Sequence, residues 1–187
     1  MNIGILGSSF NPVHKGHISI AKKAIKVFNL NQVWLMITNQ NPLKKSNVYL
    51  EYNERIRLLK KVCNSKKLVI KNFENKSNSI FLVDNLHYIK KSFPKNNFIF
   101  LMGTDSFLEI DQWKDYEKLF KQMPLAVFNR YGTKKKSLSS KIATKYKKYR
   151  FNHKNKKDIF QSVPSWCLID DFDIRVSSTS IRKISKN

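Results

Sequence analysis

Short apolar runs alternate along the chain with longer stretches that mix apolar and charged residues. These runs are apolar almost throughout, which is typical of strands buried on both faces of a parallel sheet. They cover residues 3–6, 33–37, 68–70, 97–102, 124–128 and 166–169. Residues 97–102 form the most apolar run, so we expect this strand near the centre of the sheet.

The stretches between these runs place apolar residues at helical spacing with lysines on the opposite side. They predict helices over residues 18–28, 49–63, 81–91 and 116–122. A strand, a helix and a second strand in succession favour parallel pairing with a right-handed crossover. We therefore expect an α/β fold, a Rossmann-like, doubly wound and mostly parallel sheet of five to six strands flanked by helices. The 187 residues predict a single domain over residues 1–187.

A turn of small residues follows the first strand and leads into the first helix. Gly7, Ser8 and Ser9 allow a tight turn, Pro12 stiffens it, and Gly16 leaves room for a ligand against the backbone. The free N–H groups at a helix start favour phosphate, and ligands bind at the carboxyl edge of an open α/β sheet. The turn predicts a nucleotide-phosphate site.

His14 and His17 are three residues apart in this turn, so they face the same way if both lie on one helical turn. Two imidazoles can donate hydrogen bonds to a triphosphate, and either can become cationic as negative charge builds. The pair could instead be half of a metal site. His87, His153 and two isolated cysteines supply no third or fourth ligand at zinc spacing, so we expect no protein-bound metal.

Lysine and arginine outnumber the acidic residues by 36 to 13, which gives a net charge of +23. The lysines are scattered among many asparagines and isoleucines, so we attribute much of the charge to composition and expect anionic ligands. The lysine-dense segment 133–158 is expected to be mobile or partly helical; a nucleic-acid patch there is the less favoured alternative. Cys63 and Cys167 are isolated, which favours a reducing compartment. The sequence shows no signal peptide and no apolar stretch of about 20 residues, so we expect a cytoplasmic protein.

The run from Gly7 to His17 resembles the G-x-F-[DN]-P-x-H-x-G-H signature of the nucleotidyltransferase α/β-phosphodiesterase superfamily, and F-N-P-V-H is most similar to bacterial nicotinate-nucleotide adenylyltransferases. Near the other end, S-S-T-S-I-R resembles the family's I-S-S-T-x-I-R, although helix capping alone explains its hydroxyls. The resemblance therefore covers nearly the whole chain. It implies ATP contacts from Gly7, Ser8, Ser9, Phe10, His14, Gly16, His17, Ser178, Thr179 and Arg182.

The resemblance also implies a mononucleotide site at the carboxyl edge of the sheet. Its residues are Asn39, Lys44, Phe81, Leu82, Gly103, Asp105, Trp113 and Arg130. Lys44 matches the lysine of an N-P-L-K loop, with Lys45 as the alternative. Asp105 is expected to accept hydrogen bonds from a ribose diol, or to cap a helix, and Trp113 to stack on a pyridine ring.

One stretch departs from the family pattern. The family pattern has a tyrosine and two threonines where this chain has Phe81, Leu82 and Asn85. In that pattern the threonines and backbone amides meet the nicotinate carboxylate. A hydroxyl donor is lost at Leu82, whereas the backbone N–H groups remain. Nicotinamide mononucleotide therefore stays open as a substrate beside nicotinate mononucleotide.

The resemblance implies transfer of the adenylyl group of ATP to nicotinate mononucleotide, giving nicotinate adenine dinucleotide and pyrophosphate. The implied catalytic residues are His14, His17, Lys44 and Arg182, with Mg²⁺ accompanying ATP. The alternatives are an adenylyltransferase for nicotinamide mononucleotide or phosphopantetheine, and a non-catalytic nucleic-acid-binding protein. We expect ATP and nicotinate mononucleotide as partners rather than nucleic acid or a membrane, and the oligomeric state stays open.

Overall fold

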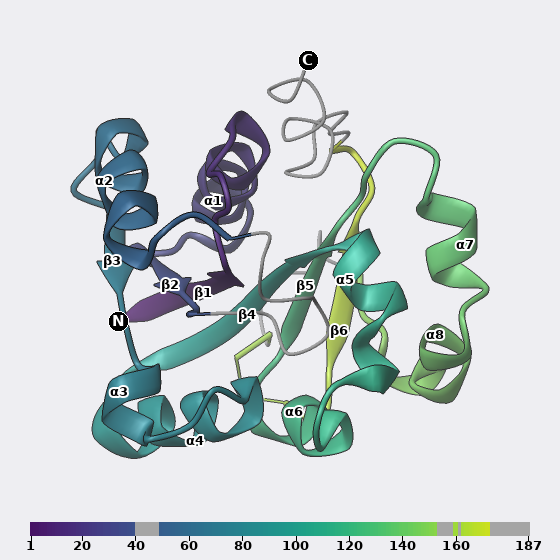
Figure 1. Ribbon diagram of the computed structural model, residues 1–187. Helices are drawn as coiled ribbons and strands as arrows, with labels where there is room; N and C mark the ends of the chain where they lie inside the picture. The colour runs from purple at the N-terminus through teal and green to yellow at the C-terminus, as the bar shows by residue number, and fades with distance from the viewer. Residues whose placement is uncertain (40–48, 153–158, 161, 173–187) are drawn as a thin grey trace.

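Six parallel strands form one sheet in the order β3-β2-β1-β4-β5-β6 (Figure 1). This computed structural model describes residues 1–39, 49–152, 159–160 and 162–172. The strands are β1 (Asn2–Ser8), β2 (Gln32–Ile37), β3 (Leu68–Lys71), β4 (Asn97–Gly103), β5 (Leu125–Phe128) and β6 (Trp166–Ile169). Each neighbouring pair is parallel. The sequence-based expectation of a Rossmann-like parallel sheet is confirmed.

Helices cover both faces of the sheet. They are α1 (Lys15–Phe28), α2 (Tyr52–Val62), α3 (Glu74–Ser77), α4 (Leu82–Ser92), α5 (Thr104–Leu108), η2 (Ile110–Gln112), α6 (Tyr116–Gln122), α7 (Lys134–Leu138), α8 (Lys141–Lys145) and η3 (Lys147–Tyr149). In Figure 1, α1 and α2 lie on one face and α3, α4 and α6 on the other. Among the described residues, no helix is long and apolar enough to cross a bilayer.

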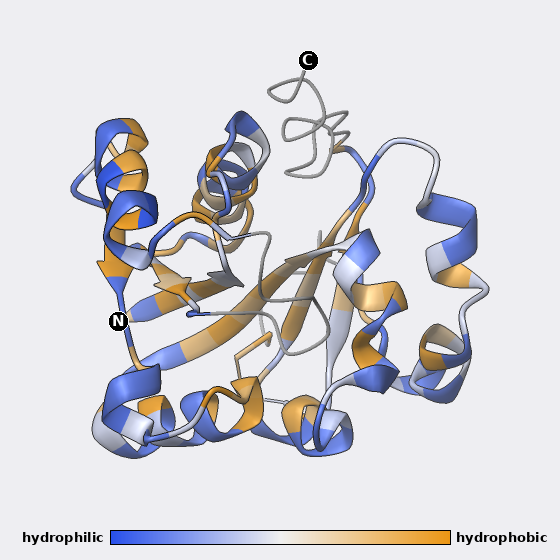
Figure 2. Cartoon of the chain, in the orientation of Figure 1, coloured by the Kyte–Doolittle hydropathy of each residue, from blue (hydrophilic) through white to orange (hydrophobic). Residues whose placement is uncertain are grey.

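The core has two parts because alternate residues of each strand face opposite sides of the sheet. Along β4, Phe98 and Phe100 pack with residues of α4 and α6, whereas Ile99 and Leu101 pack with residues of α1 and α2. Figure 2 shows the resulting apolar strands and the inward apolar sides of the helices. This double burial explains why the strands are apolar without alternation.

The short elements differ most from the sequence-based expectations. The predicted helices and strands are present with small shifts at their ends, and α1 starts at Lys15 rather than Ile18. The sequence did not predict α3, α5 or η2, which are too short to show helical periodicity. The described part of segment 133–158 contains α7, α8 and η3, so it is partly helical, as expected.

The strand order reverses between β1 and β4, whose neighbouring positions pair from Asn2 with Asn97 to Leu6 with Leu101. In open α/β sheets, ligands bind beyond the carboxyl ends of the strands at such a point. The residues that follow Ser8 and Gly103 therefore meet at the place where the topology favours a nucleotide.

Candidate functional site

His14 and His17 form a reciprocal capping box at the start of α1. His14 is the N-cap residue, and its Nδ1 accepts the backbone N–H of Gly16 at 3.1 Å. His17 lies one turn on, and its Nδ1 accepts the backbone N–H of His14 at 3.3 Å. The two rings stack with their centroids 3.9 Å apart. Histidines thus take the places that Ser/Thr and Glu/Gln usually hold in this motif.

This geometry fixes the tautomer of both rings. Because each Nδ1 accepts a hydrogen bond, each neutral ring carries its proton on Nε2. Burial and the nearby Arg130 lower the pKa of His14 to about 4. Burial first, then His14 and Arg130, hold the pKa of His17 well below its usual value of 6.5. In the ligand-free protein both rings are therefore neutral donors at pH 7, and the expectation that either becomes cationic as negative charge builds stays a prediction for the ATP complex.

The turn before α1 is held by its own side chains. Ser8 Oγ accepts the backbone N–H of Phe10 at 3.2 Å and lies 3.3 Å from His17 Nε2, which donates to it in this tautomer. The Phe10 ring is fully buried and packs edge-on against His17, with centroids 4.9 Å apart. The Phe10 side chain therefore supports His17 from the core and leaves only its backbone to face a ligand.

Asp105 and Arg130, both predicted from the sequence, form an ion pair across the ends of β4 and β5. The backbone N–H of Arg130 also donates to Thr104 Oγ1 at 3.1 Å. The N-cap of α5 is Gly103 rather than Asp105, so the helix-capping alternative for Asp105 is wrong. A Cβ at Gly103 would lie 3.5 Å from Arg130 Cδ, an ordinary contact, so crowding does not require glycine there.

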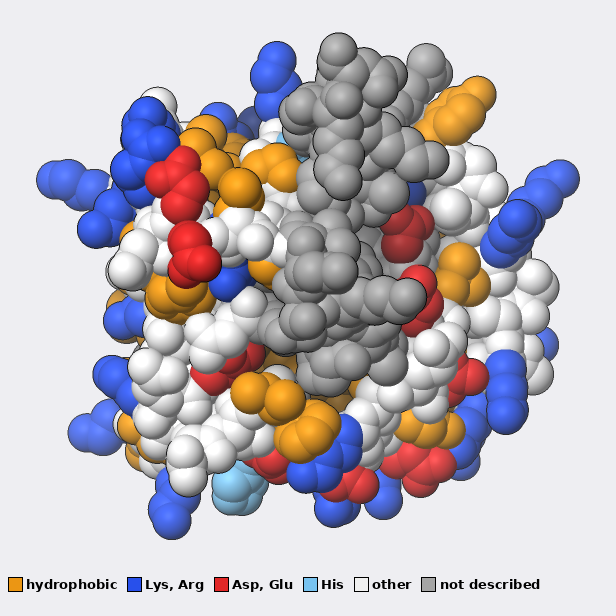
Figure 3. Space-filling model, in the orientation of Figure 1, with side chains coloured by type: hydrophobic (Ala, Val, Ile, Leu, Met, Phe, Trp, Pro, Cys, Tyr) orange, Lys and Arg blue, Asp and Glu red, His pale blue; other side chains and the backbone are white. Residues whose placement is uncertain are grey.

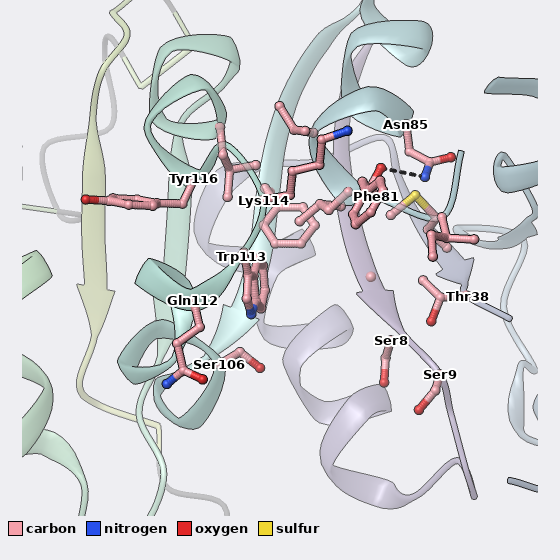
Figure 4. Close-up of a pocket in the computed structure, with 17 residues that line it drawn as sticks. Ser8, Ser9, Thr38, Phe81, Asn85, Ser106, Gln112, Trp113, Lys114 and Tyr116 are labelled. Carbon is pink, nitrogen blue, oxygen red and sulfur yellow. Dashed lines mark hydrogen bonds between the residues drawn. The ribbon is translucent and has the colours of Figure 1, made fainter. Parts of the chain in front are cut away.

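A cavity of about 430 Å³ opens beside the histidine turn, between the sheet edge and α4 to α6 (Figure 4). Ser8 and Ser9 line it from the turn, and Phe81, Leu82 and Trp113 line it from the other elements. In Figure 4, Trp113 lies across the cavity from Ser8 and Ser9. The structure thus brings residues predicted to contact ATP and residues predicted to contact the mononucleotide into one cavity.

Gly7 keeps the floor of this cavity open. A Cβ at Gly7 would come within 3.1 Å of Met36 Cε and 3.3 Å of the Phe100 ring, and all three residues line the cavity. A side chain here would have to push Met36 or Phe100 aside or fill the cavity. The glycine is therefore explained by close packing at the carboxyl end of β1.

The start of α4 is built around Asn85. Its Nδ2 donates to the backbone oxygens of Ser79 and Phe81 at 3.0 and 2.9 Å, and its Oδ1 accepts from Ser77 Oγ at 2.9 Å. Asn85 is 1% exposed. The Asn85 amide therefore shapes the loop in front of α4, and the Leu82 side chain brings no hydroxyl to the cavity.

Arg55, which was not predicted from the sequence, joins the loops after β1 and β2. The Arg55 side chain is 2% exposed, and its guanidinium donates to four backbone oxygens. The acceptors are Leu50 O, Ser9 O, Thr38 O and Asn39 O, at 3.0, 2.7, 2.7 and 2.8 Å. One signal was present, because Arg55 precedes buried Leu59 by four residues and so lies on the inner face of α2.

Glu74 holds the other side of the same loop. Its Oε2 accepts the backbone N–H of Asn39 at 2.8 Å, and burial raises the pKa of this carboxyl. The peptide groups of Asn39 are thus fixed by Arg55 and Glu74, whereas its side chain is exposed. The structure assigns Asn39 a backbone role in loop placement and does not place it among the cavity-lining residues.

Several predicted site residues lie outside the described part of the chain. They are Lys44, the alternative Lys45, Ser178, Thr179 and Arg182. Within the described ranges, no group of three or more His, Cys, Asp or Glu side chains could hold a metal ion. Figure 3 shows Lys and Arg side chains spread around the rim of one face and mixed with acidic ones, so the charge does not gather into a single patch on that face.

Comparisons with known proteins agree with this geometry. The cytidylyltransferase-like family matches residues 5–184. A probable nicotinate-nucleotide adenylyltransferase of Ruegeria sp. is 30% identical over 98% of this chain and 97% of its own length. One from Rhizobium etli is 32% identical over 97% of this chain and 95% of its own.

A solved structure shares the fold. The Plasmodium falciparum nicotinic acid mononucleotide adenylyltransferase complexed with NaAD superposes with a TM-score of 0.72 at 23% identity, over 97% of this chain and 82% of that one. The chain therefore belongs to the cytidylyltransferase-like family and, within it, to the nicotinate-nucleotide adenylyltransferases.

Proposed function

We propose that the protein transfers the adenylyl group of ATP to nicotinate mononucleotide, giving nicotinate adenine dinucleotide and pyrophosphate. The observation that carries this proposal is that Ser8 and Ser9 belong both to the histidine turn and to the lining of the cavity. These serines belong to the turn that places His14 and His17, and they also line the cavity that holds Trp113. ATP phosphates at the turn and a mononucleotide in the cavity would lie side by side.

In this reaction an oxygen of the mononucleotide 5′-phosphate attacks the α-phosphorus of ATP. One phosphorus–oxygen bond forms, the bond to the β-phosphate oxygen breaks, and pyrophosphate leaves. The protein supplies no nucleophile, so it accelerates the step by aligning the two phosphates and by stabilising the charge that develops between them.

The histidine pair is suited to that second task. With Nδ1 held by a backbone N–H, His14 and His17 each carry their proton on Nε2. The Nε2–H of His14 is a neutral donor in a fixed direction, and that of His17 would exchange Ser8 Oγ for a phosphate oxygen. We infer that His17 meets the α-phosphate and His14 a neighbouring phosphate oxygen. Preorganised donors of this kind need no rearrangement as charge develops.

Because both imidazoles are neutral before ATP binds, the positive charge must come from other groups. Arg130 lies close enough to lower the pKa of both histidines. Lys44 and Arg182 are proposed for the β- and γ-phosphates on the family resemblance. We expect Mg²⁺ to arrive with ATP and to be held by phosphate oxygens and water, since the described residues offer no carboxylate cluster for it.

We place the mononucleotide in the cavity because aromatic side chains line it. Trp113 offers a flat face for the pyridine ring, and Asp105 is available at the end of β4 for the ribose hydroxyls while it pairs with Arg130. The free N–H groups of the first turn of α4 would receive the carboxylate.

The test is product formation from MgATP with each acceptor separately. We expect pyrophosphate release and dinucleotide formation with nicotinate mononucleotide, and much slower release with nicotinamide mononucleotide or phosphopantetheine. No release with any acceptor would refute the proposal. Salt-dependent DNA binding without turnover would favour the alternative of a nucleic-acid-binding protein.

A further inference from the structure

One end of the cavity carries an ammonium group that the family signature does not include. Lys114 Nζ lies 4.2 Å from the centre of the Phe81 ring. Lys114, Phe81 and Trp113 line the same cavity. In Figure 4 the Lys114 side chain runs along the cavity, with its ammonium on the side of Phe81 and Asn85. A cation therefore lies next to the surface proposed for the pyridine ring.

The hydrogen-bond donors of this ammonium are not taken up by its acidic neighbour. Lys114 Nζ is 3.6 Å from Asp84 Oδ2, which is too long for a hydrogen bond. The same oxygen accepts from Ser79 Oγ at 2.7 Å. No acceptor bonds to Lys114 Nζ within the described part of the chain, so its N–H donors can turn toward a ligand.

The first turn of α4 adds to the positive potential at this end. Leu82 and Val83 line the cavity at the start of the helix, which spans 11 residues and has no side-chain cap. A helix start favours negative charge. Because Leu82 has no hydroxyl, the described residues offer an anion at this end the backbone N–H groups of α4 and the ammonium of Lys114.

We propose that Lys114 is a specificity-determining residue that makes the cavity prefer a pyridine mononucleotide bearing a carboxylate over one bearing a carboxamide. This inference rests on the proposed function, since it takes the cavity as the mononucleotide site. A carboxylate at C3 of a ring stacked on Trp113 gains a charge-assisted hydrogen bond from Lys114, whereas an uncharged carboxamide does not. Asp84 forms an ion pair with the ammonium at 3.6 Å and so reduces this gain, but it takes up none of the N–H donors that the carboxylate would use.

The experiment compares three variants with the wild type. Lys114→Met removes the charge and keeps much of the apolar stem, and Lys114→Arg restores a cation. Lys118→Met is the matched control, because Lys118 pairs with Asp115 at 3.0 Å and does not line this cavity. Dissociation constants for nicotinate and nicotinamide mononucleotide are measured by calorimetry without ATP, and kcat/KM with MgATP.

We expect Lys114→Met to lower the preference for nicotinate over nicotinamide mononucleotide about tenfold, the factor that one charge-assisted hydrogen bond of about 1.4 kcal/mol supplies. Lys114→Arg should keep most of the preference and Lys118→Met all of it. Added salt should weaken nicotinate mononucleotide binding more in the wild type than in Lys114→Met. A merely structural role for Lys114 would change neither the preference nor its salt dependence.

An unchanged preference in Lys114→Met overturns the inference even if the wild type makes the dinucleotide. The experiment also distinguishes the opposite case. If the wild type makes no dinucleotide but binds nicotinate mononucleotide in a Lys114-dependent way, the proposed function fails and the specificity assignment stands. A wild type that binds neither mononucleotide overturns both.

Discussion

His14 and His17 cap the start of α1 with stacked rings, and each ring accepts a backbone N–H through Nδ1. The same two bonds that complete the helix thus direct both Nε2 protons to the other side of the rings. The helix cap therefore fixes the tautomer of the two side chains that we propose for phosphate recognition.

We expect His17→Ala to lower kcat about a hundredfold or more, which is the scale of removing one preorganised donor to a developing charge. His87→Ala is the matched control, because His87 is exposed on α4 and lies outside the cavity lining. Steady-state rates with MgATP and nicotinate mononucleotide measure the effect, with circular dichroism as a check on the fold. A His17→Ala variant with wild-type kcat would contradict the role given to the imidazole.

The low pKa values of the histidines predict that stability falls with acidity. In the unfolded chain each imidazole titrates near 6.5, whereas in the folded protein the pKa of His14 is about 4. Between pH 6.5 and 5 the unfolded state therefore binds more protons, and the free energy of unfolding decreases as the pH falls. The expected loss over this range is about 1.5 kcal/mol for His14, and His17 adds a loss of the same sign.

Urea denaturation at pH 7.0 and 5.0 measures this loss. His17→Gln should lose less stability than the wild type over the same interval, because one of the two titrating rings is gone. An equal loss in both proteins would show that the pH dependence comes from other groups.

We expect Arg55→Ala to lower the free energy of unfolding by about 3 kcal/mol, because it leaves buried backbone oxygens in two loops without their donor. Arg55→Lys should recover part of the loss, since an ammonium has three donors but lacks the planar fork. Chemical denaturation provides the measurement.

Arg57→Ala is the control on the same helix. Arg57 is exposed and pairs with Glu54 one turn away at 2.6 Å, so its loss should leave the free energy of unfolding almost unchanged. Equal effects at the two arginines would contradict the role given to Arg55.

Trp113→Ala should raise the KM for nicotinate mononucleotide about tenfold, because base–aromatic stacking contributes about 1–3 kcal/mol. Trp113→Phe, which keeps a flat ring, should retain most of the affinity. The KM for ATP, measured in the same assays, is the internal reference. A rise in both KM values by the same factor would indicate a general disturbance rather than lost stacking.

The fold was predictable because its signals are local. A strand buried on both faces must be apolar throughout, as residues 98–102 of β4 show, and α1 carries its apolar side at regular spacing. Parallel pairing and the central place of β4 could be predicted in this way, whereas the full strand order came from the structure. Elements of four or five residues, such as α3 and α5, fall below the length at which spacing is informative.

The chemistry of the site was only partly predictable. The motif placed His14 and His17 in the right turn, but their charge state depends on burial and on Arg130, which is more than a hundred residues away in sequence. Arg55 was not identified as a site residue from the sequence. Its actual acceptors come from loops on two other strands, and no local pattern records them.

The Arg55 guanidinium has a mechanical consequence. Ser9 belongs to the loop after β1 and Thr38 to the loop after β2, and both carbonyls bind the same Nη1 atom. Neither loop can shift without breaking one of these two bonds or drawing the other loop along, so a displacement of one loop is passed to the other through Arg55.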